Sequence, residues 1–453
     1  MRKLFFDHAL LAEGWATNVG MDIEDGTIRA VVAGVDPVGY ERVRGIALPG
    51  IASLHSHTFQ RGMAGLGETR GPSSDSFWSW RQVMYRFVDL LTADDVEAIA
   101  AFAFMEMLEG GFTSVGEFHY LHHGIKGQPY ANLAEHCERI AAAAATTGIG
   151  LTLLPVLYTH GGFGGKSPVE GQRRFLNDNE RFLKLLEGAR SAIQGLPGAV
   201  VGIAPHSLRA VSPEGLADVL AASPASQVHI HVAEQMREVE DCIAWSGQRP
   251  VEWLLNNTSV DHRWCLIHAT HMNDGEAARL ANSGAVAGIC PITEANLGDG
   301  IFNAPTYLGA QGAYGVGSDS NVEISAPGEL KQFEYSQRLA LRARNVVPQA
   351  EGQSTGGVLY RSGAAGGAKA LARGDGSLGI GQSADIVVLD AGHPDLEHAK
   401  GDRWLDAYIF ASGKPAINSV FIRGKRLVEG GWHQNREAII KRYSATIGRL
   451  ASA

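Results

Sequence analysis

The chain has 453 residues, of which 45% are hydrophobic and 19% are charged, so it can hold one large α/β domain and a smaller module. Its net charge of −9 comes without a basic patch, which excludes nucleic acid as an expected partner. No apolar run approaches the roughly 20 residues of a membrane helix, and Asp7 and His8 interrupt the apolar start of the chain before it could form a signal peptide. The four cysteines are scattered, which argues against a disulfide framework and a thiolate zinc site. We therefore expect a cytoplasmic protein that does not bind membranes.

The two ends of the chain have the character of short strands. Four runs carry this pattern: residues 15–23, 27–32, 384–390 and 419–430. Asp25-Gly26, between the first two runs, is a typical two-residue hairpin turn. Neither end alone offers enough strands to bury the face of a sheet. The sequence therefore predicts that residues 1–48 and 375–453 pack together as one small β-sandwich.

Residues 49–374 alternate apolar runs with amphipathic helical patterns, which is typical of βα units and a parallel sheet. Eight candidate strands cover residues 51–57, 113–118, 151–157, 200–204, 228–232, 264–269, 285–290 and 314–318. Candidate helices cover residues 93–108, 133–145, 171–186 and 328–342. The predicted fold of this domain is therefore a (β/α)8 TIM barrel. A long insertion, residues 62–89, follows the first strand and is expected over the active-site face.

Polar residues fall at or just past the C-terminal ends of these strands, where barrel enzymes carry their catalytic groups. His55 and His57 stand two residues apart in a strand, so their side chains point to the same side and can bind one metal ion. The later strands bring four more such residues: His231, Glu234, His268 and Asp319. Three imidazoles and one carboxylate, with a position left for water, suit a catalytic zinc or similar divalent ion.

This pattern resembles the amidohydrolase superfamily over essentially the whole chain. In that family the first-strand His-x-His, the fifth-strand His and the eighth-strand Asp hold one metal ion, which implies these ligands here: His55, His57, His231 and Asp319. Members with two metals have a bridging lysine at the end of the fourth strand, and residues 200–210 contain none. The resemblance therefore implies one divalent ion, for which we expect zinc.

The run from His231 to Glu234, together with His268, is similar to the deaminase branch of the superfamily. Four further segments resemble the formimidoylglutamate deiminases of histidine breakdown: residues 77–81, 117–120, 206–209 and 293–300. This likeness implies hydrolysis of N-formimino-L-glutamate to N-formyl-L-glutamate and ammonia. Asp319 would then accept the proton of the attacking water, and His268 would hold the attacking oxygen. Glu234 would pass a proton to the departing nitrogen.

A small dicarboxylate substrate needs cationic donors in the pocket. Arg81 and Arg209 are the candidates, because a buried arginine requires an anionic partner and its planar fork binds a carboxylate through two hydrogen bonds. Gln60, Tyr120 and His206 are expected to assist, with Gln60 at the formimino group. We expect the protein to be a homodimer.

Other readings share parts of this pattern. A deaminase of a heterocyclic base would use the same metal site but would favour aromatic stacking over paired arginines, and a barrel without catalytic activity would be expected to have lost a ligand. His229 shares a strand face with His231, which we prefer as the ligand because Glu234 is spaced from it. Structural roles are expected for His119, His122, His123, Trp78, Trp80, Glu294 and Asp299.

Overall fold

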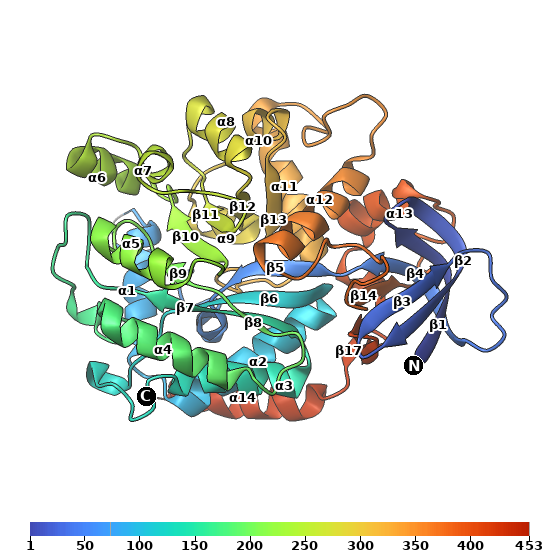
Figure 1. The fold of residues 1–453 in the computed structure, drawn as a ribbon, viewed down its shortest axis with the longest axis horizontal. Coiled ribbons are helices and arrows are strands. Elements are labelled where there is room, and N and C mark those ends of the chain that lie inside the picture. Colours follow the sequence, from blue (N-terminus) through green and yellow to red (C-terminus); the bar gives the residue numbers. More distant parts are fainter. Residues whose placement is uncertain (73, 453) are drawn as a thin grey trace.

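The computed structural model describes residues 1–72 and 74–452, so one residue of the predicted insertion 62–89, Ser73, lies outside the described part. Two parallel sheets occupy the middle of the molecule (Figure 1). The first contains β5 (Ile51–Ser56), β6 (Phe112–His119), β7 (Gly150–Leu157) and β8 (Val200–Val201), with β9 (Ala204–Pro205) paired to β7. The second contains β10 (Val228–Val232), β11 (Trp264–His268), β12 (Val286–Ile289) and β13 (Ala313–Val316).

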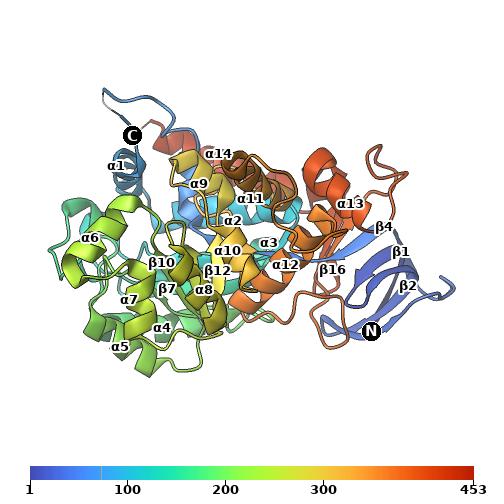
Figure 2. The same ribbon diagram turned by 90° about the horizontal axis from the view of Figure 1, so that it is seen from above.

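Single parallel bridges join the edges of the two sheets. Ile203 pairs with Val228 and Ser207 pairs with His231 at one seam, while Ser56 pairs with Asp319 at the other. The order of pairing therefore runs from β5 through β13 and returns to β5. The strands are buried almost throughout and helices surround them (Figure 2), as expected for parallel sheets.

Both chain ends meet in a third, eight-stranded sheet, called here the end sheet. Its N-terminal strands are β1 (Arg2–Leu11), β2 (Gly14–Glu24), β3 (Thr27–Val32) and β4 (Glu41–Pro49), and its C-terminal strands are β14 (Ile386–Leu389), β15 (Ile417–Ile422), β16 (Lys425–Glu429) and β17 (Trp432–His433). The order is β17-β16-β15-β14-β4-β1-β2-β3, so β4 and β14 join the two ends. The turn between β2 and β3 has positive φ at both Asp25 and Gly26, as a primed hairpin turn requires.

All helices but the last lie in the connections between these strands. The helices are α1 (Phe77–Val88), α2 (Ala93–Glu109), α3 (Glu135–Thr147), α4 (Asn179–Ala192), α5 (Pro213–Ala222), α6 (Met236–Ser246), α7 (Pro250–Asn257), α8 (Asp274–Ser283), α9 (Pro291–Leu297), α10 (Ala304–Gly309), α11 (Ala326–Leu341), α12 (Thr355–Ala370), α13 (Asp402–Ala407) and α14 (Arg436–Leu450). Among the described residues, no helix is both long and apolar enough to cross a bilayer.

Several predicted bounds differ from the structure. The predicted helix at 171–186 is wrong in its first half, because the Asp178 side chain accepts the backbone N–H of Arg181 and caps α4 at its observed start. The predicted strand at 200–204 is divided between β8 and β9. The first strand ends at Ser56, so His57 lies just before the short helical turn η1 (Thr58–Met63).

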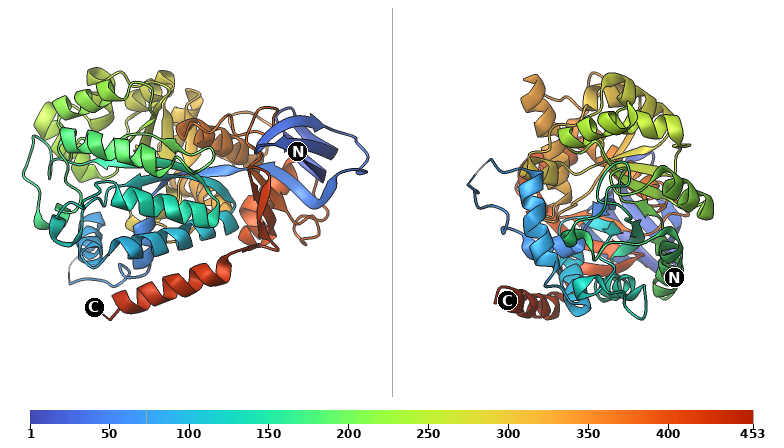
Figure 3. Two further views of the ribbon diagram at one scale, coloured as in Figure 1. Left: turned by 60° about the horizontal axis from the view of Figure 1, so that its bottom comes forward. Right: turned by 90° about the vertical axis from the view of Figure 1, so that its left-hand side faces the viewer.

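The C-terminal helix α14 leaves the end sheet and runs along α2 (Figure 3). The rings of Phe102 and Tyr443 stack with their centres 3.9 Å apart. Arg442 forms an ion pair with Glu97 at the same interface. The last helix of the chain is therefore packed against the domain that carries the parallel sheets.

Candidate active site

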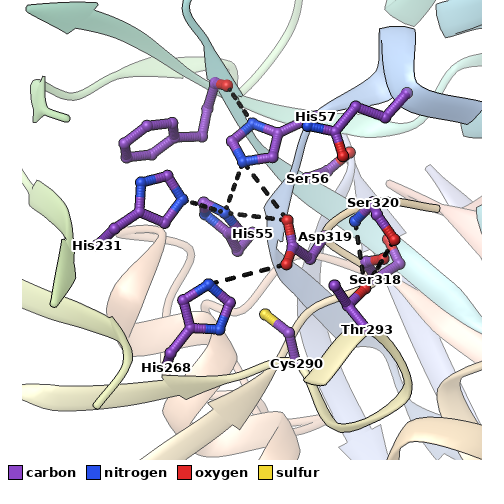
Figure 4. Close-up of polar contacts among 12 residues, drawn as sticks. His55, Ser56, His57, His231, His268, Cys290, Thr293, Ser318, Asp319 and Ser320 are labelled. Carbon is purple, nitrogen blue, oxygen red and sulfur yellow. Dashed lines mark hydrogen bonds and ion pairs between the residues drawn. The ribbon is translucent and has the colours of Figure 1, made fainter. Parts of the chain in front are cut away.

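Three histidines and one aspartate meet at the C-terminal ends of the parallel strands (Figure 4). His55 Nε2 lies 3.1 Å from the Nε2 atoms of both His57 and His231. Asp319 follows β13, and its Oδ1 lies 3.5 Å from His55 Nε2 and 3.4 Å from His57 Nε2. All four side chains are buried. The structure thus brings together the four residues that the sequence suggested as ligands.

The hydrogen bonds of the rings show that this group suits a cation. His57 donates from Nδ1 to the carbonyl of Phe118 at 2.8 Å, and His231 donates from Nδ1 to the carbonyl of His206 at 3.1 Å. A neutral imidazole that donates from Nδ1 has its lone pair on Nε2. His55 Nε2 faces both lone pairs and could donate a proton to only one of them, so a bound cation would relieve the remaining repulsion. Nitrogens bound to tetrahedral zinc at about 2.0–2.1 Å stand roughly 3.3 Å apart, close to the separations seen here.

Burial keeps the rings of this group neutral. It lowers the pKa of His55 to about 3 and holds the pKa of His231 well below its usual value. For Asp319, burial works against ionisation, but the hydrogen bond from His55 and the nearby His268 outweigh it and hold the carboxyl pKa below its usual range. Neutral imidazoles and an ionised carboxylate are the forms that bind a divalent ion.

His268 ends β11 and faces the same centre. Its Nε2 lies 3.8 Å from both Asp319 Oδ2 and Glu234 Oε1, and its Nδ1 lies 3.2 Å from Glu294 Oε1. Burial disfavours the imidazolium, but Glu234, Glu294 and Asp319 outweigh burial and raise the His268 pKa to about 10. Glu294 also accepts the backbone N–H of Cys290 at 2.9 Å. Glu294 therefore bridges His268 and the backbone of Cys290, and it orients His268.

Comparison with known proteins defines the family. The model of the amidohydrolase family matches residues 46–427, and the model described as the N-terminal domain of formimidoylglutamate deiminase HutF matches residues 1–45. The chain belongs to the amidohydrolase family. It is 48% identical to formimidoylglutamate deiminase of Pseudomonas aeruginosa over 99% of this chain and 100% of that protein.

Solved structures agree with this assignment. The crystal structure of an amidohydrolase from Brucella melitensis is similar to this amidohydrolase with a TM-score of 0.96 and 54% identity over 100% of both chains. An adenosine deaminase from Xanthomonas campestris with bound zinc shares the fold, with a TM-score of 0.82 and 20% identity over 100% of this chain and 98% of that one. The fold is therefore of the TIM-barrel type found in the family.

The buried centre opens into a pocket that contains all five predicted substrate residues of this amidohydrolase: Gln60, Arg81, Tyr120, His206 and Arg209. Arg81, on α1, stacks on the rings of Trp78 and Tyr85 at 5.0 and 5.3 Å. Its buried Nε has no hydrogen-bond partner among the described residues. The insertion thus contributes α1, with Arg81, to the wall of the pocket.

Arg209 lies between two buried carboxylates. Its Nη2 stands 3.5 Å from Glu234 Oε2 and 3.8 Å from Glu238 Oε2, and its Nε has no partner in the described chain. Burial works against the charge of Arg209, but Glu238 and Glu234 outweigh it and raise the Arg209 pKa. Arg209 is therefore a cation whose hydrogen-bonding capacity is not used up by the protein.

The neutral pocket residues are held by neighbours. Gln60 donates to the hydroxyl of Tyr120 at 2.8 Å, while Gln60 Oε1 is buried without a partner in the described residues. His206 Nδ1 contacts Ser207 Oγ at 2.9 Å. Sequence reasoning missed four aromatic residues that line the pocket: Phe77, Tyr85, Tyr158 and Phe175. They come from three separate stretches: Phe77 and Tyr85 lie on α1, Tyr158 follows β7 and Phe175 precedes α4, so no single local pattern marks them.

Residues with expected structural roles lie as follows. His229 contacts the carbonyl of Ala370 through Nε2 at 2.9 Å, whereas His231 lies beside His55. His122 and His123 contact the backbone carbonyls of Val156 and Leu176. Trp80 lines the pocket, while Trp78 packs on Arg81 and on Arg237 of α6. Asp299 accepts a hydrogen bond from Gln235, the residue that follows Glu234.

Proposed function

We propose that this amidohydrolase hydrolyses N-formimino-L-glutamate to N-formyl-L-glutamate and ammonia, a reaction of histidine catabolism. The full-length likeness to formimidoylglutamate deiminase supports this function. The observation that carries it is the pocket itself, in which Arg81 and Arg209, each with an unpartnered buried Nε, accompany the histidine centre. A substrate with carboxylates at one end and a formimino group at the other matches this distribution of charge.

One divalent ion, zinc, is proposed for the centre, with His55, His57, His231 and Asp319 as its ligands. The facing lone pairs of His57 and His231, the His55 Nε2 between them and the carboxylate beside them support this ligand set. When bound, such an ion lowers the pKa of water from 15.7 to about 7 and polarises the C=N bond. The proposal of a single ion rests on the family pattern, since residues 200–210 contain no lysine that could bridge a second one.

The reaction breaks a C–N bond, adds water and releases ammonia. Asp319 is proposed to accept a proton from the attacking water, and His268, 3.8 Å from Asp319 Oδ2, to donate a hydrogen bond to the attacking oxygen. Glu234 is proposed to deliver a proton to the departing nitrogen. Its carboxyl pKa is raised mainly by burial, which favours the protonated form that such a step requires.

Arg81 and Arg209 are proposed to bind the substrate carboxylates. Tyr120 and His206 would add neutral hydrogen bonds, and the free Gln60 Oε1 would accept one from the formimino N–H. The pocket aromatics also suit a planar ring, so a heterocyclic base is the alternative substrate.

For the fold, we propose that the two parallel sheets form one closed (β/α)8 barrel, with residues 49–374 as the barrel domain. The bridges at both seams support closure. The β-sandwich proposed for residues 1–48 and 375–453 would be formed by the single end sheet around a separate hydrophobic core that contains Phe6, Met21, Ile386 and Phe421, while α14 packs against α2. The family matches also divide the chain near residue 45.

The location and assembly of the protein remain predictions. The four cysteines are free and buried, which suits the reducing cytoplasm proposed for this reaction. A homodimer is the assembly that we expect, and light scattering of the purified protein would test it.

Ammonia release tests the function. The purified protein, with its metal content measured, is incubated with formiminoglutamate and with a panel of aminopurines and cytosine. Release from formiminoglutamate alone, with equimolar N-formylglutamate, is the expected result. Faster ammonia release from a heterocycle would make that heterocycle the substrate in place of formiminoglutamate. No ammonia release from any compound by metal-loaded protein would refute the proposed hydrolase activity.

A further inference from the structure

Glu238, in the first turn of α6, is completely buried although it carries an ionisable group. Its Oε1 accepts the backbone N–H of Ala233 at 3.2 Å, and its Oε2 accepts that of Glu234 at 3.3 Å. The same Oε2 lies 3.8 Å from Arg209 Nη2. Burial of a carboxylate costs free energy unless such partners compensate for the lost water. The Glu238 side chain has three of them, two neighbouring backbone donors and one cation.

The two backbone donors belong to a strained turn. Ala233 has φ of 51°, in the left-handed region that a residue with a Cβ rarely adopts. Its carbonyl accepts the N–H of His271 at 3.0 Å, so the turn is held from both sides. This turn links His231, at the metal-binding group, to Glu234. Glu238 therefore fixes the direction in which the Glu234 side chain leaves the backbone.

Glu238 also affects the charge balance of the pocket. Arg209 stands between Glu234 and Glu238 at 3.5 and 3.8 Å, and its side chain donates no hydrogen bond to another described residue. With Glu238 as a second carboxylate beside it, Arg209 does not depend on Glu234 alone for neutralisation. Glu234 is then free to exchange a proton, and the guanidinium keeps donors available for a substrate carboxylate.

We propose that Glu238 is a positioning residue that holds the Glu234 backbone and the Arg209 guanidinium in fixed relation, so that proton transfer and carboxylate binding act on one substrate molecule. This inference rests on the proposed deimination. Glu238 touches neither the substrate nor the metal-binding group, and it acts through the two residues that it contacts.

The test compares Glu238→Gln with Glu240→Gln, an exposed glutamate on the same helix. Glutamine keeps the volume of Glu238 but turns an NH2 group toward a backbone N–H, so one contact is lost. For formiminoglutamate we expect kcat per bound metal to fall at least tenfold and KM to rise at least threefold, with metal content unchanged. Glu240→Gln should match wild type. A kcat per bound metal within twofold of wild type, or an unchanged KM, would overturn the proposal.

A double-mutant comparison tests whether Glu238 acts through Glu234. In a Glu234→Gln background, Glu238→Gln should lower kcat by less than a further twofold, and a full multiplicative loss would contradict the proposal. If Glu238→Gln does not fold, Glu238→Asp gives the same test, because it keeps the charge but cannot reach both N–H groups; a wild-type kcat and KM in that variant would also overturn it. Wild-type protein that releases no ammonia would refute the proposed function instead.

Discussion

Replacement of Arg81 by alanine should separate carboxylate recognition from the chemistry of the centre. Arg81 contacts the rings of Trp78 and Tyr85 and forms no ion pair with a carboxylate in the described chain. The substitution therefore leaves no protein anion without a partner, so the loss reports the contact with the substrate. Since the side chain is only partly buried, we take the lower part of the range for a desolvated charge pair, about 2–3 kcal/mol, which corresponds to roughly a 30- to 150-fold decrease in kcat/KM.

The assay uses three compounds: formiminoglutamate, its analogue without the side-chain carboxylate and its analogue without the α-carboxylate. Wild type and Arg81→Ala are compared by kcat/KM, with metal content measured in parallel. The variant should lose 30-fold or more on formiminoglutamate and on the analogue that keeps the carboxylate bound by Arg81. On the other analogue the change should stay below about threefold.

Two controls sharpen the comparison. Arg86→Ala removes an exposed arginine from the same helix and should leave all three values unchanged. Arg81→Lys should recover little activity, because an ammonium cannot reproduce the planar fork of the guanidinium. An equal loss on all three compounds, or a loss below threefold on each, would show that Arg81 does not bind a carboxylate.

Four other substitutions probe the centre and its surroundings. His57→Ala should lose both the metal and the activity, whereas His229→Asn should keep its metal, because His229 contacts the carbonyl of Ala370 instead; metal analysis distinguishes them, and full metal content in His57→Ala would remove that residue from the ligand set. Glu234→Gln should keep the metal but lose about 10²- to 10⁴-fold in kcat, and near-native turnover would leave Glu234 with a structural role. Burial raises the pKa of Glu117 from 4.5 to about 7, so its protonated form is favoured in the folded state, and this contribution to stability is lost as the pH rises from about 4.5 to 7. Glu117→Gln should therefore gain about 3 kcal/mol relative to wild type between pH 4 and pH 8, measured by denaturant unfolding, and a pH-independent difference would contradict the shift.

Much of the centre could be predicted from sequence because its residues follow strand ends. The spacing of His55 and His57, and the positions of His231, His268 and Asp319 after apolar runs, place all five at the C-terminal ends of parallel strands. Side chains two residues apart in an extended segment point to the same side, so the sequence also predicts that His55 and His57 face one centre. The structure accordingly brings these side chains together.

The supporting residues could not be found in this way. Glu238 occupies a polar-looking position between exposed Arg237 and Glu240, and only the fold of the Ala233 turn against α6 buries it. Tyr158 comes from the end of β7, and its role in the pocket depends on contacts between distant segments. Helix α4 begins later than predicted because a cap, not hydrophobic periodicity, sets its first residue.

The pairing of β4 with β14 has a consequence for the order of events during synthesis. Strand β4 is followed after Gly50 by β5, the strand that carries His55, and one edge of β4 is completed only by a strand more than 330 residues later in the chain. At the other seam, Ser56 can form its bridge only after Asp319 has been synthesised. On the ribosome, β4 and β5 therefore emerge long before these two partners. Complete assembly of the centre, and with it tight metal loading, is expected only after nearly the whole polypeptide has been released.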